Sequence, residues 1–138
     1  PVSLNTSFAS KENKLAEIVT NMTKQNRVLI VAKHQESMRM VCSVLHVNSN
    51  LKNLKYRVLT SNNVVKVLSK FEKGQIHFLV INGSQISCGL NITNTTDIIF
   101  YQRMSIDMEN QIIGRAHRLG RKHTKLTVYT LLHAAERN

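Results

Sequence analysis

Apolar residues follow two alternating patterns along this chain. In some stretches they recur every three to four positions, as in Leu15, Ile18, Val19 and Met22, and this spacing predicts amphipathic helices. Between these stretches lie short, unbroken apolar runs, which are typical of strands that are covered on both faces. The two patterns predict helices at 11–24, 36–47, 62–72 and 107–119 and strands at 28–31, 56–59, 76–81, 98–101 and 126–131.

Helices and strands therefore alternate along the chain. This order predicts an α/β fold, with a mostly parallel central sheet and helices on both of its faces. Residues 48–55 and 82–91 are expected to be loops between these elements. Residues 1–9 are polar and irregular and are expected to be a linker, which leaves one domain at 10–138. Because the chain begins with Pro1 rather than Met, we expect it to be a fragment of a longer protein.

The ends of two helices carry recognisable signals. Ser10 is expected to cap the first helix, because its hydroxyl can accept a hydrogen bond from an unpaired N–H of the first turn. Thr60 or Ser61 is expected to do the same for the helix at 62–72. Gly74 is expected to end that helix, because glycine readily adopts the left-handed conformation that follows a helix.

Charge and cysteine usage limit the possible partners. The chain of 138 residues has 19 Lys and Arg against 8 Asp and Glu, a formal net charge of +11 that is spread along its length. A broad basic surface of this kind indicates nucleic acid as the partner. A membrane surface is the weaker alternative, because no helix is strongly basic and amphipathic and no apolar run approaches ~18 residues. Cys42 and Cys88 have no CxxC neighbour and the His residues have no ligand spacing, so we expect a reduced, intracellular chain without a metal site.

Polar turns follow three of the predicted strands. They are Lys33-His34-Gln35, Thr60-Ser61 and Ser84 to Asn91. In an open parallel sheet, ligands bind beyond the carboxyl ends of the strands, which is where these turns fall. Their hydroxyl, amide and backbone N–H groups could donate hydrogen bonds to phosphates. Each turn taken singly is also compatible with ordinary turn chemistry.

The helix predicted at 107–119 places Gln111, Arg115 and Arg118 on one face. Two guanidinium groups on a rigid element suit phosphate oxygens, although an arginine pair alone is more often a solvated or salt-bridged surface. Gly120 is expected to stop this helix. A second, apolar stripe is expected to face the core and consists of Ile112, Ala116 and Leu119.

The full pattern at 111–120, Gln-x-x-Gly-Arg-x-His-Arg-x-Gly, resembles motif VI of superfamily 2 helicases and translocases, and most closely that of their Swi/Snf-type branch. Residues 28–33 resemble motif IV. Residues 84–91 are similar to motif V, which ends Gly-Leu-Asn-Leu in that branch and Gly-Leu-Asn-Ile here. The resemblance covers roughly residues 10–132. Two departures, the missing Asp-Gly-Ser near the second strand and Met104-Ser105-Ile106 in place of Trp-Asn-Pro, suggest a divergent member such as one encoded by a large DNA virus.

The resemblance implies the C-terminal RecA-like domain of an ATP-dependent helicase or translocase, its second motor domain. By this resemblance Arg115 and Arg118 reach the nucleotide phosphates, one as an arginine finger, and Gln111 orients them or touches the nucleotide. Gly89, Asn91 and Gly114 are the further residues assigned to nucleotide binding. Contacts to the phosphate backbone of DNA or RNA are assigned to Lys33, His34, Thr60, Ser61, Ser84, Gln85 and Ser87.

Half of a phosphoryl-transfer site is missing from the sequence. It contains no G-x-x-x-x-G-K-[ST] and no D-E-x-[DH] motif. ATP and Mg²⁺ are therefore expected to be bound mainly by an N-terminal RecA-like domain of the same protein, and this chain alone is expected to be inactive. The alternative is a non-catalytic basic α/β module that binds nucleic acid; a protein-interaction platform is a third reading. The expected location is intracellular, in the nucleus or, for a viral protein, in a cytoplasmic virus factory or the virion.

Overall fold

The computed structural model describes residues 10–51, 53–88, 92–117 and 125–132, and the side chains among them except those of 50, 51 and 86–88. Its centre is a five-stranded sheet in the order β2-β3-β1-β4-β5, in which every pairing is parallel. The strands are β1 (Val28–Ala32), β2 (Tyr56–Val58), β3 (Phe78–Asn82), β4 (Asp97–Phe100) and β5 (Thr127–Thr130). The helices are α1 (Lys11–Thr20), α2 (Gln35–Leu51), α3 (Val64–Glu72) and α4 (Ile106–Ala116), with a short 3₁₀ helix, η1 (Gly83–Cys88).

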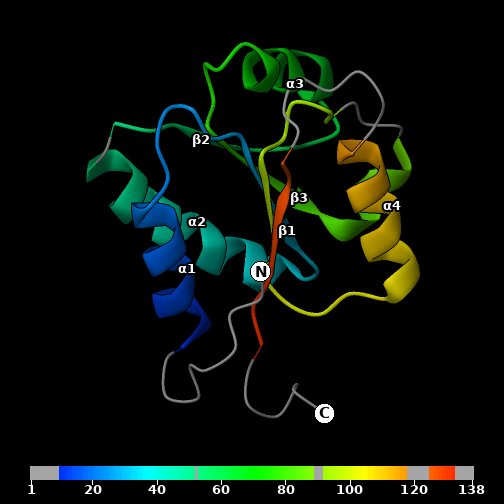
Figure 1. The fold of residues 1–138 in the computed structure, drawn as a ribbon, viewed down its shortest axis with the longest axis horizontal. Helices are drawn as coiled ribbons and strands as arrows, with labels where there is room; N and C mark the ends of the chain where they lie inside the picture. Colours follow the sequence, from blue (N-terminus) through cyan, green and yellow to red (C-terminus); the bar gives the residue numbers. More distant parts are fainter. Residues whose placement is uncertain (1–9, 52, 89–91, 118–124, 133–138) are drawn as a thin grey trace.

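Helices cover both faces of the sheet, as Figure 1 shows. Successive side chains of β1 point to opposite faces: Leu29 and Val31 pack with α3 and α4, whereas Val28, Ile30 and Ala32 pack with α1 and α2. All of these β1 residues are fully buried. This double burial explains why the strand is an unbroken apolar run, and it confirms the predicted fold class.

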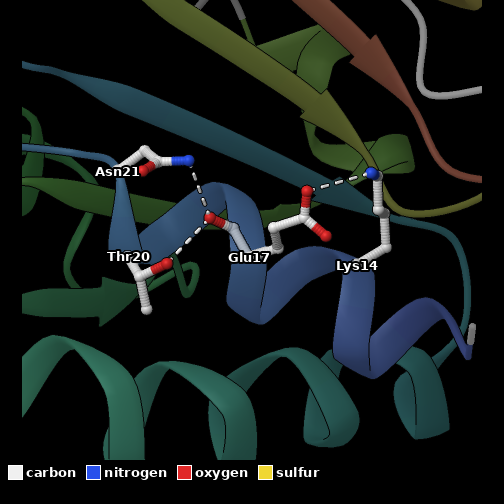
Figure 2. A network of polar contacts seen from close by, with 4 residues as sticks. All are labelled: Lys14, Glu17, Thr20 and Asn21. Atoms are coloured by element: carbon white, nitrogen blue, oxygen red, sulfur yellow. Dashed lines mark hydrogen bonds and ion pairs between the residues drawn. The ribbon is translucent and has the colours of Figure 1, made fainter.

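The first helix begins where its sequence predicts and ends earlier. The Ser10 hydroxyl accepts a hydrogen bond from the N–H of Asn13 at 3.1 Å, which confirms the predicted cap. At the other end the side chains of Thr20 and Asn21 both donate to the carbonyl of Glu17, at 2.8 and 3.2 Å (Figure 2). These short polar side chains take up a carbonyl of the last turn, and α1 ends at Thr20 rather than at residue 24.

The second helix is longer than predicted, and the loop expected at 48–55 begins too early. Asn48 and Ser49 lie inside α2 and their side chains donate to the carbonyls of Val44 and Leu45, four residues back. Satisfied in this way, they are tolerated within a helix instead of ending it.

The third helix begins at Val64, and its predicted cap was wrong. The N-cap residue is Asn63 rather than Thr60 or Ser61. The Asn63 amide oxygen accepts from the N–H of Thr60 at 2.8 Å and its nitrogen donates to the carbonyl of Val58 at 3.1 Å. This amide closes the turn after β2, so Thr60 and Ser61 belong to the turn and not to the helix start.

The fourth helix also starts as a capped helix should and ends before residue 119. The Ser105 hydroxyl accepts from the N–H of Met108, and the Glu109 carboxylate accepts from the N–H of Met104, both at 3.1 Å. The helix ends at Ala116 with His117 as its C-cap, at φ −102° and ψ 55°. The predicted stop, Gly120, lies outside the described residues.

Gly74 ends α3 in the predicted manner and has a second role. Its φ is +81°, and a Cβ on it would lie 2.1 Å from Nη2 of Arg27. The residue therefore supplies a left-handed turn and the space that the guanidinium occupies.

We expect Gly74→Ala to lower the free energy of unfolding by about 1–3 kcal/mol, because the alanine must hold an unfavourable φ and displace Arg27. Urea denaturation measures this directly. Gly114→Ala is the matched control: it lies within α4, its added Cβ meets no described atom within 4 Å outside the helix itself, and it should raise stability by about 0.5–1 kcal/mol. Equal effects of the two changes would contradict this account.

His77 is a buried histidine that accepts a hydrogen bond. It is 7% exposed, and its Nδ1 accepts from the N–H of Lys55 at 3.0 Å. Burial lowers the pKa of His77, and the positive charges of Arg27, Lys24 and Lys55 lower this pKa further. The folded chain therefore holds the neutral ring.

Because the pKa of His77 is lower in the folded chain, the unfolded chain binds more protons as the pH falls below about 6.5. The stability that the neutral ring contributes is present above this pH and is lost as the pH falls through the folded pKa. His77→Asn retains an acceptor for the Lys55 N–H and should make the stability less dependent on pH. Urea titrations of both proteins at neutral and mildly acidic pH test this, and identical pH profiles would refute it.

Candidate functional site

The carboxyl ends of all five strands lie at one edge of the sheet, because every pairing is parallel. We call this the carboxyl edge. Each predicted polar turn begins there: residues 33–35 follow β1, residues 60–61 lie just beyond β2, and residues 84–91 follow β3. The prediction that the turns share one edge is therefore confirmed.

Side-chain amides connect these turns. The oxygen of Gln85 accepts from the N–H of Asn82 at 2.7 Å, and its nitrogen donates to the carbonyl of Leu59 at 2.8 Å. Asn82 in turn donates to the carbonyl of Lys33 at 3.4 Å, while Gln102 accepts from the N–H of Lys33 at 2.9 Å. An amide both donates and accepts, so a few of them can link the exits of β2, β3, β1 and β4.

This network separates the residues assigned to nucleic acid into two groups. Lys33, His34, Thr60 and Ser61 are exposed at the carboxyl edge. Ser84 is exposed too, but its hydroxyl donates to Oδ1 of Asn82 at 2.8 Å. Gln85 is half-buried, and both ends of its amide are already hydrogen-bonded to backbone. It positions the turns rather than offering a free group. Ser87 lies in η1, where its side chain is not described.

The sequence pattern did not predict the residues that hold the edge together. Asn63, Asn82 and Gln102 have no recognisable spacing, because their partners are backbone atoms of distant segments. It also missed a groove of about 580 Å³ between α2 and the exit of β2, whose lining includes Arg39, Cys42, Thr60 and Gln85. Burial raises the pKa of the Cys42 thiol, which makes this thiol a poor nucleophile.

The predicted motif VI residues lie on α4 as far as the structure describes them. Ile112 and Ala116 are fully buried, which confirms the predicted apolar stripe. Gln111 and Gly114 are exposed and Arg115 is half-buried. Gln111 and Arg115, one helical turn apart, therefore project from the same side of α4. Four assigned residues lie outside the described residues: Gly89, Asn91, Arg118 and the stripe residue Leu119.

Helix α4 contacts the carboxyl-edge turns at its first turn, but the side of the helix that carries Arg115 is separate from these turns. Met108, in the first turn of α4, packs on the start of η1: its Sδ lies 2.7 Å from the position of a Cβ on Gly83. Arg115 lies two turns further along, roughly 10 Å from Met108 along the helix axis. Within the described residues no hydrogen bond or ion pair joins Arg115 to the turns.

Two features are absent from the described part of the chain. There, no three His, Cys, Asp or Glu side chains come together as a group that could hold a metal ion. In the same ranges, no helix is long and apolar enough to cross a membrane.

A parallel five-stranded sheet covered on both faces, with polar turns at one edge, matches the RecA-like fold of helicase C-terminal domains. Residues 10–120 match the model of the helicase conserved C-terminal domain, so the chain belongs to this family. This confirms the resemblance to superfamily 2 helicases that motif VI indicated.

Relatives and solved structures agree with this assignment. The chain is 27% identical over 124 residues to "Putative helicase R592" of Acanthamoeba polyphaga mimivirus, covering 86% of this chain and 14% of R592. Its fold is similar to the C-terminal part of the Fun30 ATPase domain, with a TM-score of 0.78 and 20% identity over 97% of this chain and 44% of that one. It is also similar to the E. coli DEAD-box protein SrmB, with a TM-score of 0.69 and 18% identity over 92% of this chain and 72% of that one.

We expect Gln85→Leu to lower the free energy of unfolding by about 1–3 kcal/mol, because it leaves the Asn82 N–H and the Leu59 carbonyl without their partner. Ser61→Ala, in an exposed position of the neighbouring turn, should change stability by less than about 0.5 kcal/mol. Urea denaturation of the two variants measures the difference. A Gln85→Leu protein as stable as the Ser61→Ala protein would show that the amide network does not hold this edge.

Proposed function

We propose that this chain is the second motor domain of an ATP-dependent helicase or translocase. In this proposal an N-terminal RecA-like domain of the same protein binds most of the ATP and Mg²⁺, and the present chain alone does not hydrolyse ATP. The observation that carries the proposal is the side of α4 that presents Gln111, Gly114 and Arg115. Within the described residues, Gln111 and Gly114 are exposed and Arg115 is half-buried, whereas Ile112 and Ala116 on the opposite side are packed in the core. The mimivirus relative supports a viral helicase as the parent protein.

The open side of α4 suits an approach by phosphate groups. Apart from α4 itself, no described atom lies within 4 Å of the position of a Cβ on Gly114, so a facing domain could come close to the helix backbone there. Arg115 is half-buried, which restricts its side chain while its planar donor fork stays available. Such a guanidinium stabilises the charge that develops on a phosphoryl group during its transfer to water. Arg118, by its place in motif VI, would supply the second positive charge.

Gln111 would support this arrangement from one turn away. Its amide can donate to a phosphate or accept from a water, so it can orient either beside Arg115. Gly89 and Asn91, by their place in motif V, would contribute contacts at the nucleotide. These roles follow the motif pattern, and each is a hypothesis about a parent protein.

The carboxyl edge would bind the phosphate backbone of DNA or RNA. Lys33 supplies positive charge there, His34 supplies an exposed imidazole, and Thr60 and Ser61 supply hydroxyl donors. Ser84 was assigned to the same role, and its hydroxyl would have to exchange its bond to Asn82 for one to phosphate. Contacts of this type fix position without reading bases, so we expect binding that is independent of sequence and falls as salt rises. Fixed amides such as Gln85 would keep the turns in register with successive phosphates.

In a parent protein that carries both motor domains, Arg115→Ala should lower kcat for nucleic-acid-stimulated ATP hydrolysis by about a thousandfold or more, because a finger arginine acts mainly in the transition state. Binding of nucleic acid should be largely retained. Steady-state ATP turnover and salt-dependent binding measure the two effects. If turnover were unchanged and only the salt dependence of binding became shallower, the chain would instead be the non-catalytic basic module.

Two further variants distinguish a close approach to α4 from a general effect of positive charge. Lys66→Ala removes one exposed positive charge from α3 and should leave turnover unchanged. Gly114→Ala should reduce turnover although it stabilises the helix, because its methyl group fills the space in front of a facing domain. A Gly114→Ala protein that is both more stable and fully active would show that nothing approaches α4 at this position.

A further inference from the structure

The amino-terminal edge of the sheet carries a second basic site that the motifs do not include. Lys24 and Arg27 precede β1, Lys55 precedes β2 and His77 precedes β3. Because β2, β3 and β1 are neighbours and parallel, their entries lie side by side at the edge opposite the carboxyl edge. We call Lys24, Arg27, Lys55 and His77 the amino-edge cluster.

Backbone hydrogen bonds hold the three entries together. The N–H of Val28 donates to the carbonyl of His77, and the N–H of His77 donates to the carbonyl of Lys55, both at 2.8 Å. The N–H of Lys55 returns a bond to Nδ1 of His77. In the neutral ring the proton is therefore on Nε2, which makes that nitrogen a donor.

Arg27 is fixed at the centre of the cluster. Its Nη1 donates to the carbonyls of Lys24 and Asn26 at 2.8 and 3.0 Å, and Gly74 leaves room for Nη2. Its Nε is buried and has no hydrogen-bond partner. The enclosed Nε cannot itself reach a ligand, but the backbone bonds at Nη1 hold this guanidinium in place, unlike a lysine or arginine that simply extends into solvent.

The cations of the cluster are not paired with a carboxylate. Asp97, which begins β4 at the same edge, accepts hydrogen bonds from the Asn26 amide and the Thr96 hydroxyl instead. Lys24, Arg27 and Lys55 form no ion pair with any other described residue. All three raise the positive potential at His77, which is the reason for their effect on its pKa. Like charges around one histidine repel one another, and an anion bound between them would offset that repulsion.

We propose that the amino-edge cluster binds a backbone phosphate of nucleic acid, as a contact separate from the carboxyl edge. A fixed guanidinium, an imidazole donor and two mobile ammonium groups together suit an anion with several acceptor oxygens. A polyanion is also the partner that a net charge of +11 favours. The cluster lies about 16 Å from the carboxyl edge, the length of a five-residue strand, so its phosphate belongs to a different segment of the nucleic acid.

The test uses this chain with oligo(dT) and follows the imidazole resonances of His77 by NMR as the pH changes. Bound phosphate favours the imidazolium form, so the pKa of His77 should rise when the chain is saturated with oligo(dT). In Lys24→Ala/Lys55→Ala this rise should be smaller, affinity should fall about tenfold, and the salt slope should decrease by about two. Both lysines are exposed, so the double variant should remain folded.

Two control variants locate the effect. Lys66→Ala, on α3, should leave both the affinity and the His77 response nearly unchanged, whereas Lys33→Ala, at the carboxyl edge, should weaken binding but leave the His77 response at saturation. An unchanged pKa of His77 at saturation would overturn the proposal. So would a response to poly-glutamate but not to oligo(dT), which would assign the cluster to an acidic protein. Neither result depends on ATP turnover or on Arg115, so this test can fail while the proposed motor function stands.

Discussion

The parallel pairing of β1 with both β3 and β4 is the constraint on which the rest of the structure depends. Val28 pairs with Phe78 on one side and with Asp97 on the other, and the strand is fully buried between two layers of helices. Since the neighbouring strands run in the same direction, everything that precedes a strand collects at one edge and everything that follows it collects at the other. Whether a basic residue precedes or follows a strand therefore decides whether it lies at the amino-terminal edge or at the carboxyl edge.

The carboxyl edge depends on neutral amides rather than on ion pairs. Asn82, Gln85 and Gln102 connect the strand exits through backbone atoms. Lys33 takes part in this network through its backbone N–H and carbonyl, and its side chain remains exposed. Turns held by neutral amides suit a surface that binds a polyanion, because a lysine that is already paired with a carboxylate attracts a phosphate less strongly. By contrast, the exposed pair of Lys14 and Glu17 on α1, 3.3 Å apart, is of the kind that contributes little to stability.

At the amino edge, by contrast, a cationic side chain and a histidine are themselves hydrogen-bonded to the backbone. Arg27 is fixed by backbone carbonyls and by the space above Gly74, and His77 is fixed by its bond to the Lys55 N–H. Their mutual repulsion opposes folding, and it rises as the pH falls and His77 becomes protonated. The predicted acid sensitivity of the free chain and the proposed affinity for phosphate are thus two consequences of one arrangement.

Local patterns along the sequence determined the elements and their arrangement. The unbroken apolar run of β1, the spacing of Ile112 and Ala116 and the alternation of helix and strand predicted an α/β sheet covered on both faces, and the motif VI residues indicated the family. Helix ends were predicted less well. Similar short polar side chains have three different effects here. Thr20 ends α1, Asn48 lies within α2, and Asn63 closes the turn after β2.

Only the tertiary structure decided which polar groups are free to act. Gln85 and Ser61 both lie in polar turns of the carboxyl edge, yet the amide of Gln85 is engaged by Asn82 and by Leu59, 26 residues away, whereas Ser61 is exposed. Likewise, Lys24, Lys55 and His77 are far apart in sequence and form no motif, and they meet because three parallel strands begin side by side. A sequence determines which groups are present; whether a group is engaged or available depends on contacts between distant segments, because hydrogen bonding and charge act through space.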